Sequence, residues 1–212
     1  LARPLTKSSL LWPGRDLVIC VAAKVSVMEA FWVSTGVVAI AEIGDKTQLL
    51  ALLLAARFKK PLPIIFGILL ATLLNHGLAG ALGIWLMASI DPLWLQWALG
   101  ISFIAMGIWA LVPDKLDLQD TNLRGSLGIL GATCVLFFLA EIGDKTQIAT
   151  VALAAHYQSA ILVVIGTTLG MLIANVPAVL LGDKILSKIP MKLFRWLAAA
   201  AFLILGLVAL FG

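Results

Sequence analysis

Hydrophobic residues fill this chain in long runs that short polar connections separate. A helix needs about 20 apolar residues to cross the hydrocarbon core of a bilayer. Six runs reach that length, and we expect one transmembrane helix in each: 30–56, 62–88, 94–112, 126–155, 158–181 and 192–211. The pattern therefore predicts an all-α membrane protein with six transmembrane helices.

Composition supports this prediction. The chain is 62% hydrophobic and only 12% charged, whereas soluble domains carry about 25% charged and about 45–50% apolar residues. The formal net charge of +4 comes from lysines and arginines in connections, so we expect no nucleic-acid partner. Cys20 and Cys134 stand apart and indicate neither a disulfide framework nor a metal-binding pair.

The octapeptide AEIGDKTQ occurs at 41–48 and again at 140–147, a displacement of 99 residues. With one inserted residue allowed before the asparagines, further pairs align: Gly67/Gly166, Asn75/Asn175, Trp97/Trp196 and Gly107/Gly206. Self-similarity of this kind indicates a repeated structural unit. The unit is three helices, at 28–112 and 126–212, with a polar linker at 113–125.

An odd number of spans forces the second unit to cross the membrane in the opposite direction. We therefore expect two inverted three-helix repeats, as in many secondary transporters whose sites lie at the repeat interface near mid-membrane. Residues 1–27 lie outside this pattern. We expect a poorly defined tail there, either an upstream extension or a segment lying on the membrane, rather than a seventh span.

Basic residues lie on one set of connections: Arg57, Lys59, Lys60, Lys115, Arg124, Lys184, Lys188, Lys192 and Arg195. The loops around Asp91 and Tyr157 contain no lysine or arginine. Cytoplasmic loops carry the excess of basic residues in membrane proteins. The basic loops and the linker should therefore be cytoplasmic.

Each octapeptide carries two acids three residues apart, and on a continuous helix they would share one face: Glu42 with Asp45, and Glu141 with Asp144. Ionisable groups near mid-bilayer cost about 2.5–3.5 kcal/mol each, face the bundle interior and mark functional sites. Gly44 and Gly143 would loosen the backbone or admit a neighbouring helix.

If the two copies converge, four carboxylates with Lys46 and Lys145 leave two negative charges, which one divalent cation neutralises. Oxygen ligands suit Mg²⁺, Ca²⁺ or Mn²⁺. The candidate ligands are Glu42, Asp45, Glu141, Asp144, Asn75, Asn175, Gln48 and Gln147, although the asparagines could equally join helices by hydrogen bonds. Four close carboxylates cannot all stay ionised when the cation leaves, so protons should replace it.

Other interpretations stay open for several polar residues. Lys46 and Lys145 are candidate counter-cations for the empty site, but Lys46 could instead pair with Glu42 within one helix. Thr47 and Thr146 should donate to backbone carbonyls, with ligation of the cation as the lesser alternative. His76 and His156 fit packing or interfacial roles, with a proton relay as the alternative for His76. The motifs could also serve only to hold helices together.

The doubled E-x-G-D-K-T motif in a six-span chain resembles the Gdt-type cation/proton exchanger family, which includes bacterial manganese exporters. The resemblance covers about 28–212 and implies proton-coupled export of Mn²⁺, with Ca²⁺ as a further substrate, across a bacterial inner membrane. It implies roles for the four acids and for Lys46, Thr47, Lys145 and Thr146.

Two rival functions remain: an exporter of amino acids or small metabolites, and a structural membrane subunit. No cofactor is expected. An enzyme is not expected either, because the chain has no zinc-protease helix motif, nucleophile elbow or phosphate loop.

Overall fold

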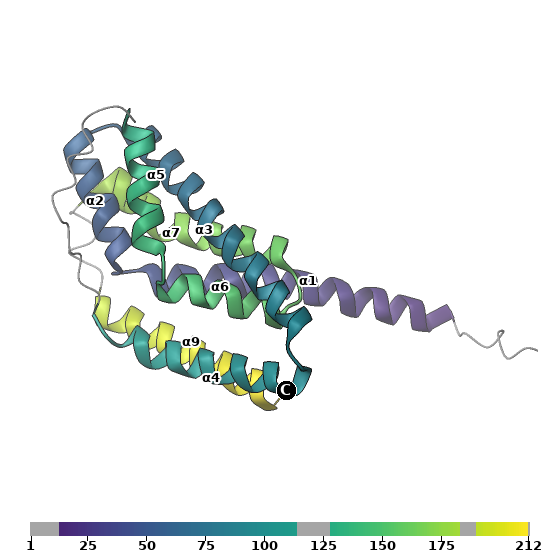
Figure 1. The fold of residues 1–212 in the computed structure, drawn as a ribbon. Coiled ribbons are helices and arrows are strands. Elements are labelled where there is room, and N and C mark those ends of the chain that lie inside the picture. The colour runs from purple at the N-terminus through teal and green to yellow at the C-terminus, as the bar shows by residue number, and fades with distance from the viewer. Residues whose placement is uncertain (1–12, 114–127, 183–189, 212) are drawn as a thin grey trace, which may run out of the picture.

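The computed structural model describes residues 13–113, 128–182 and 190–211 and is helical throughout. This part of the chain contains eight helices (Figure 1): α1 Pro13–Glu42, α2 Lys46–Phe58, α3 Pro61–Ser89, α4 Pro92–Ala110, α5 Gly128–Glu141, α6 Lys145–His156, α7 Ala160–Leu181 and α9 Met191–Phe211. Most of the expected linker, with Lys115 and Arg124, lies outside the described residues, as do Lys184 and Lys188.

In the part of the chain that the structure describes, four helices are long and apolar enough to cross a membrane: α3, α4, α7 and α9. They coincide with four of the expected spans. The other two expected spans are each divided, into α1 with α2 and α5 with α6, so the prediction of a continuous helix through each motif was wrong. Helix α1 begins at Pro13, and its backbone therefore extends well into the segment expected to be a tail.

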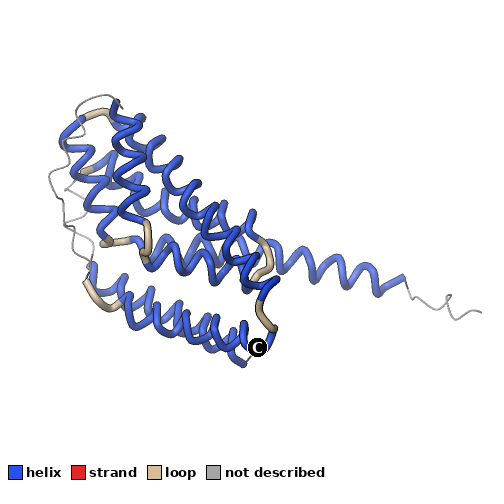
Figure 2. The backbone as a smooth tube through the Cα atoms, viewed as in Figure 1, coloured by secondary structure: helices blue, strands red, loops and turns tan. Residues whose placement is uncertain are grey.

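Both interruptions have the same cause in the sequence. Gly44 and Gly143 adopt positive φ angles of 84° and 73°, which an L-residue with a Cβ rarely adopts. Asp45 and Asp144 follow in extended conformation and stand at the N-cap positions of α2 and α6. Aspartate is a preferred N-cap residue, so glycine ends one helix and the next residue starts another (Figure 2).

The motif glutamines hold these turns closed. Gln48 Oε1 accepts a hydrogen bond from the Gly44 N–H at 2.9 Å, and Gln147 Oε1 accepts one from the Gly143 N–H at 2.7 Å. Each bond gives the amide of the positive-φ glycine a partner within its own turn. The fourth residue after each glycine therefore completes the turn that the glycine opens.

Helices from the first half pack mainly on helices from the second: α1 on α7, α3 on α5, and α4 on α9. Glycines allow the backbones to approach closely. A Cβ on Gly170 would lie 2.6 Å from Thr35 O of α1, and one on Gly67 would lie 2.8 Å from Leu130 O of α5. Small residues at such crossings are typical of membrane helices.

The chain passes its two motif turns in opposite directions. In Figure 1, α1 approaches its turn from the side toward which α6 leaves, and α2 leaves toward the upper left, from where α5 arrives. The start of α9 also lies at the left, while the α3–α4 connection and the C-terminus lie at the lower right. The described basic positions at 57–60 and 192–195 therefore lie at the end opposite Asp91.

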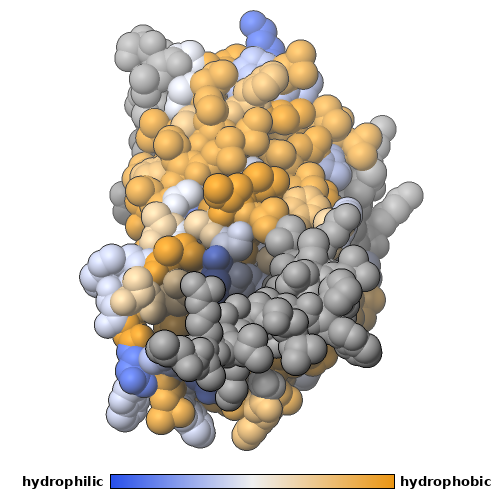
Figure 3. Space-filling view, turned by 90° about the vertical axis from the view of Figure 1, so that its right-hand side faces the viewer, coloured by the Kyte–Doolittle hydropathy of each residue, from blue (hydrophilic) through white to orange (hydrophobic). Residues whose placement is uncertain are grey.

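The exterior carries many large apolar side chains, and much of the described surface in Figure 3 is hydrophobic. Leu78 and Ile161, for example, are 63% and 74% exposed. An exposed apolar surface of this extent suits a lipid environment. The polar groups lie inside instead, around the two motif turns.

Substitution of Gly170 tests the α1–α7 packing, with Gly77 on α3 as the control. Gly170→Ala would push a Cβ against backbone atoms of α1 that cannot move aside, and we expect a loss of about 1–3 kcal/mol of stability. Gly77→Ala is the matched control, because no atom lies within 4 Å of its new Cβ; there the helix should gain up to about 1 kcal/mol. Thermal unfolding of the purified variants measures both. Equal effects would contradict the close packing.

Candidate cation site

The two motif turns face each other and exchange ion pairs. Lys46 Nζ of the first copy lies 2.8 Å from Asp144 Oδ1 of the second, and Lys145 of the second pairs with Asp45 of the first. The pairing of Lys46 with Glu42 within one helix, one of the alternatives from the sequence, is therefore replaced by a pairing between copies. The helix ends at Glu42, so the four-residue spacing no longer places these two side chains on one face.

Three carboxylates converge between the turns. Glu42, Asp45 and Asp144 each bring one oxygen into a group whose members all lie within 4.8 Å of one another. All three side chains are buried. Glu141 is also buried and interacts electrostatically with these three acids, although it stands outside the closest group.

Threonines orient the two glutamates. Thr47 Oγ1 donates to Glu42 Oε2 at 2.5 Å, and Thr146 Oγ1 lies 3.0 Å from Glu141 Oε2. The expectation that these threonines donate to backbone carbonyls was wrong, because the break in each helix turns the hydroxyl toward the acid. Among the described residues, no donor reaches Glu42 Oε1 or Glu141 Oε1. Each glutamate thus keeps one buried oxygen for a cation or a proton.

The neutral candidate ligands are engaged differently in the two halves. Gln147 donates to Asn75 Oδ1, and the amide of Asn75 donates to Phe138 O at 3.3 Å. Gln48 donates instead to Ala174 O at 2.8 Å. Asn175 donates to Met171 O at 3.0 Å, and its Oδ1 has no partner among the described residues. The glutamines therefore serve the turns in this structure, whereas Asn175 keeps an available oxygen.

The two histidines make contacts with residues outside the two motifs. His76 is fully buried and its Nδ1 lies 2.9 Å from Thr167 Oγ1 on α7. His156 ends α6 and lies edge-to-face with Phe103, with ring centroids 6.5 Å apart. The packing or interfacial role expected for both residues stays a prediction, as does the proton relay that is the alternative for His76.

Two residues beside the first turn were not among the candidates from the sequence. The Met191 sulfur lies 2.6 Å from where a Cβ on Gly44 would stand, and Arg195 lines a small cavity together with Asp45 and Lys145. Both belong to the first turns of α9. For this segment the sequence predicts only the start of a span that follows a basic loop. Their spacing of four residues on one helix face is the signal that was available.

The site combines buried oxygen donors with two lysines, of which Lys145 is buried and Lys46 is partly exposed. Glu42, Asp45 and Asp144 form a group suited to a cation that prefers oxygen ligands. Lys46 and Lys145 supply positive charge to the same carboxylates. A cation entering this cluster and protons bound to it would use the same oxygens.

Apolar helices long enough to cross a membrane, arranged around buried acids, make this a multi-pass membrane protein. The profile of the family described as "Divalent cation/proton antiporter GDT1" matches residues 30–118 and 129–212, and the chain belongs to this family. No solved structure matches the chain.

Relatives agree with this membership. A Vibrio cholerae protein named "Putative manganese exporter" is 50% identical over 186 residues, which is 87% of this chain and 92% of that protein. GDT1-like protein 3 of Oryza sativa subsp. indica is 30% identical over 200 residues, covering 82% and 71% of the two chains. "Protein PAM71-homolog, chloroplastic" of Arabidopsis thaliana is 28% identical over 233 residues, covering 94% and 63%.

Proposed function

We propose that this protein exports a divalent cation, Mn²⁺ in the first place, from the cytoplasm in exchange for protons. One observation carries the proposal: two identical motifs from opposite halves of the chain meet, exchange ion pairs and bring three buried carboxylates together. The name of the Vibrio cholerae relative supports Mn²⁺ as the substrate. Ca²⁺ is the second candidate, because it also takes oxygen ligands.

The cation is bound by Glu42, Asp45 and Asp144. Glu141, which interacts electrostatically with these acids, and Asn175, whose Oδ1 has no partner among the described residues, are the further candidate ligands. Lys46 and Lys145 hold the carboxylates when the cation is absent. Protons bind the same carboxylate oxygens. These carboxylates must lose their protons before the metal ion binds. Competition for one set of carboxylates is all that antiport requires thermodynamically.

Alternating access uses two inverted three-helix repeats, 28–112 and 126–212. The opposite directions in which the chain passes its motif turns support this arrangement. The packing supports it as well, since α1 with α7 and α3 with α5 are equivalent pairs under the repeat. The linker at 113–125 and the basic ends are cytoplasmic, in a bacterial inner membrane.

The rival functions find less support in the site. An exporter of amino acids needs a sizeable cavity at its binding residues, but the cavity beside Asp45 has a volume of about 10 Å³, which holds roughly one water molecule. A purely structural role would leave no reason for buried glutamate oxygens without donors among the described residues.

Everted membrane vesicles test the function, because they expose the cytoplasmic face. With an acidified interior, added Mn²⁺ should enter while the interior pH rises, and a protonophore should suppress the uptake. Mn²⁺ uptake that neither depends on the pH gradient nor dissipates it would refute proton exchange. Parallel uptake of Ca²⁺ ranks the two cations.

Cysteine labelling tests the orientation. In a background without Cys20 and Cys134, a cysteine at Lys59 should resist impermeant thiol reagents in intact cells, whereas one at Asp91 should react. The reason is the excess of basic residues at the end that carries Lys59. Everted vesicles should reverse the pattern and serve as the control. Labelling of Lys59→Cys in intact cells would overturn the orientation.

A further inference from the structure

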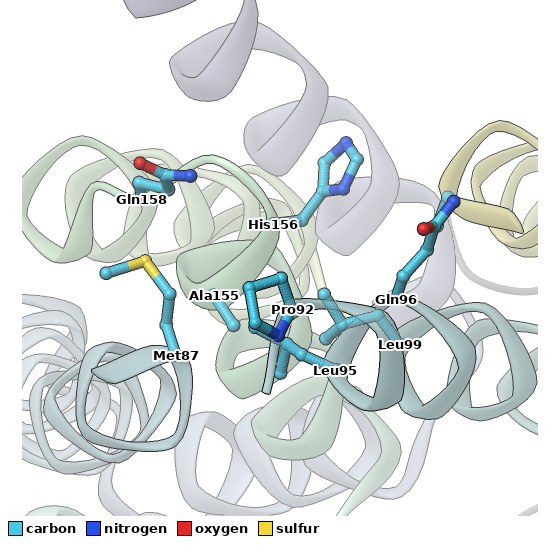
Figure 4. Close-up of a pocket in the computed structure, with 9 residues that line it drawn as sticks. Met87, Pro92, Leu95, Gln96, Leu99, Ala155, His156 and Gln158 are labelled. Atoms are coloured by element: carbon cyan, nitrogen blue, oxygen red, sulfur yellow. The ribbon is translucent and has the colours of Figure 1, made fainter. Parts of the chain in front are cut away.

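Each end of the α4–α9 pair carries a cavity. The first, here the motif cavity, is lined by Asp45 and Lys145 of the two motifs together with Ala110 of α4 and Arg195 and Ala198 of α9. The second, here the far cavity, is lined by Gln96 and Leu99 of α4 and Ala209 of α9, with His156 of α6 (Figure 4).

The α4 and α9 walls of the two cavities are equivalent under the 99-residue repeat. The displacement that aligns Trp97 with Trp196 also relates three pairs of lining residues: Gln96/Arg195, Leu99/Ala198 and Ala110/Ala209. Each member of a pair lies in the opposite cavity from its counterpart. If the repeats are inverted, the cavities are candidates for the two mouths of the transport path, and they are called mouths below.

The mouths differ in depth. The motif cavity is narrow, about 10 Å³, but Asp45 forms part of its wall. The far cavity measures about 230 Å³, yet neither motif lines it. One helical turn deeper than Leu99 and His156 stand Phe103 and Leu153, both fully buried in an apolar cluster. Only the motif cavity reaches the carboxylates in this conformation.

The mouths also differ in charge at one equivalent position. Arg195 is half-buried in the wall of the motif cavity, and a guanidinium stays protonated at any physiological pH. Its counterpart Gln96 is neutral and donates to Leu210 O at 3.0 Å. A divalent cation approaching Asp45 through the motif cavity must pass a fixed positive charge, whereas the far cavity presents none at this position.

We infer that Arg195 sets the apparent affinity for the divalent cation at the cytoplasmic mouth, an inference that rests on the proposed function. Its charge opposes the pull of the carboxylates on a cation entering from that side. The exporter then works only when the cytoplasmic concentration of the divalent cation is high. At low concentration the cation that the cell needs stays in the cytoplasm. At the opposite mouth the equivalent residue, Gln96, is neutral and does not repel the cation.

Removing the charge should lower KM without raising kcat. For Arg195→Gln, which installs the residue of the repeat counterpart, we expect the KM for Mn²⁺ in everted vesicles to fall by about 3–30-fold, the effect of one charge on a divalent cation across several ångströms of protein and water. Lys192→Gln is the matched control, since Lys192 is exposed one turn away and does not line the cavity. Its KM should stay close to that of the wild type because salt screens exposed charges.

A chemical switch keeps the test independent of folding differences between variants. In the background without Cys20 and Cys134, Arg195→Cys is purified and then modified with a positively charged or a neutral thiol reagent of similar size. The charged adduct should raise KM above that of the neutral adduct. Gln96→Arg should leave KM at the cytoplasmic face unchanged and raise it for transport from the opposite face.

Several results would overturn the inference. An unchanged KM in Arg195→Gln with intact transport would refute it, as would an equal decrease in Lys192→Gln, which would indicate general surface charge. Equal KM values for the two cysteine adducts would refute it without reference to the glutamine variant. A wild-type protein that does not transport Mn²⁺ would instead refute the proposed function and the inference with it.

Discussion

Glu42→Gln is expected to reduce Mn²⁺ transport by about 100-fold or more while the protein stays folded, given that loss of groups that merely orient metal ligands already costs about 10–100-fold. The amide of glutamine keeps the shape of the glutamate side chain and can still accept a hydrogen bond from the Thr47 hydroxyl. It removes a full charge from the group of three carboxylates and an oxygen that exchanges protons. A neutral amide is also easier to bury than a carboxylate, so stability should hold.

Transport and thermal unfolding should be measured on the same purified, reconstituted variant. Glu29→Gln is the control, because Glu29 is exposed on α1 and lies outside the carboxylate group. That variant should transport normally. If Glu42→Gln lost stability but transported at wild-type rates wherever it remained folded, the carboxylates would hold helices together and the ion path would lie elsewhere.

Lys145→Gln should destabilise the protein by about 3–5 kcal/mol, the usual cost of removing one partner of a buried ion pair. The side chains of Lys145 and Asp45 are only 4% and 0% exposed, so water cannot replace the lost lysine. Lys46→Gln should cost less, because the Lys46 side chain is 23% exposed and its pair with Asp144 is partly screened.

The double variant Asp45→Asn with Lys145→Gln tests whether the cost belongs to the pair. Replacing both charges removes the buried carboxylate as well, so most of the stability should return. Denaturant or thermal unfolding of the two single variants and the double variant gives the coupling free energy between Asp45 and Lys145. Additive losses, or an equal loss in Lys46→Gln, would contradict the ion pairing between the two copies.

The sequence predicted the spans that are continuous. Helices α3, α4, α7 and α9 follow uninterrupted apolar runs, whose length alone identifies a membrane helix. Gly44 and Gly143 were expected to loosen the backbone or admit a helix, but the end of a helix at each was not predicted, because the hydrophobic runs continue through both turns. A glycine followed by aspartate, with glutamine four residues after the glycine, is the local pattern that encodes the turn.

The sequence predicted which charged residues form the candidate site but not which lysine pairs with which acid. Repetition of the octapeptide brought the acids and lysines to attention, and the structure places them together. The sequence could not assign Lys46 to Asp144, because that contact depends on how the two halves dock. The sequence predicts ligands in the glutamines and donors to backbone carbonyls in the threonines. Their partners in the structure are the turn amides and the glutamates, and these are within reach only because the helices break.

Calorimetry of Mn²⁺ binding tests the central claim, that cation and protons compete for one set of carboxylates. Titrations of the purified protein in buffers of different ionisation enthalpy count the protons released per bound cation. The account predicts proton release and an affinity that rises with pH, because the carboxylates must lose protons before they bind the metal. Binding that releases no protons, with an affinity independent of pH, would contradict it.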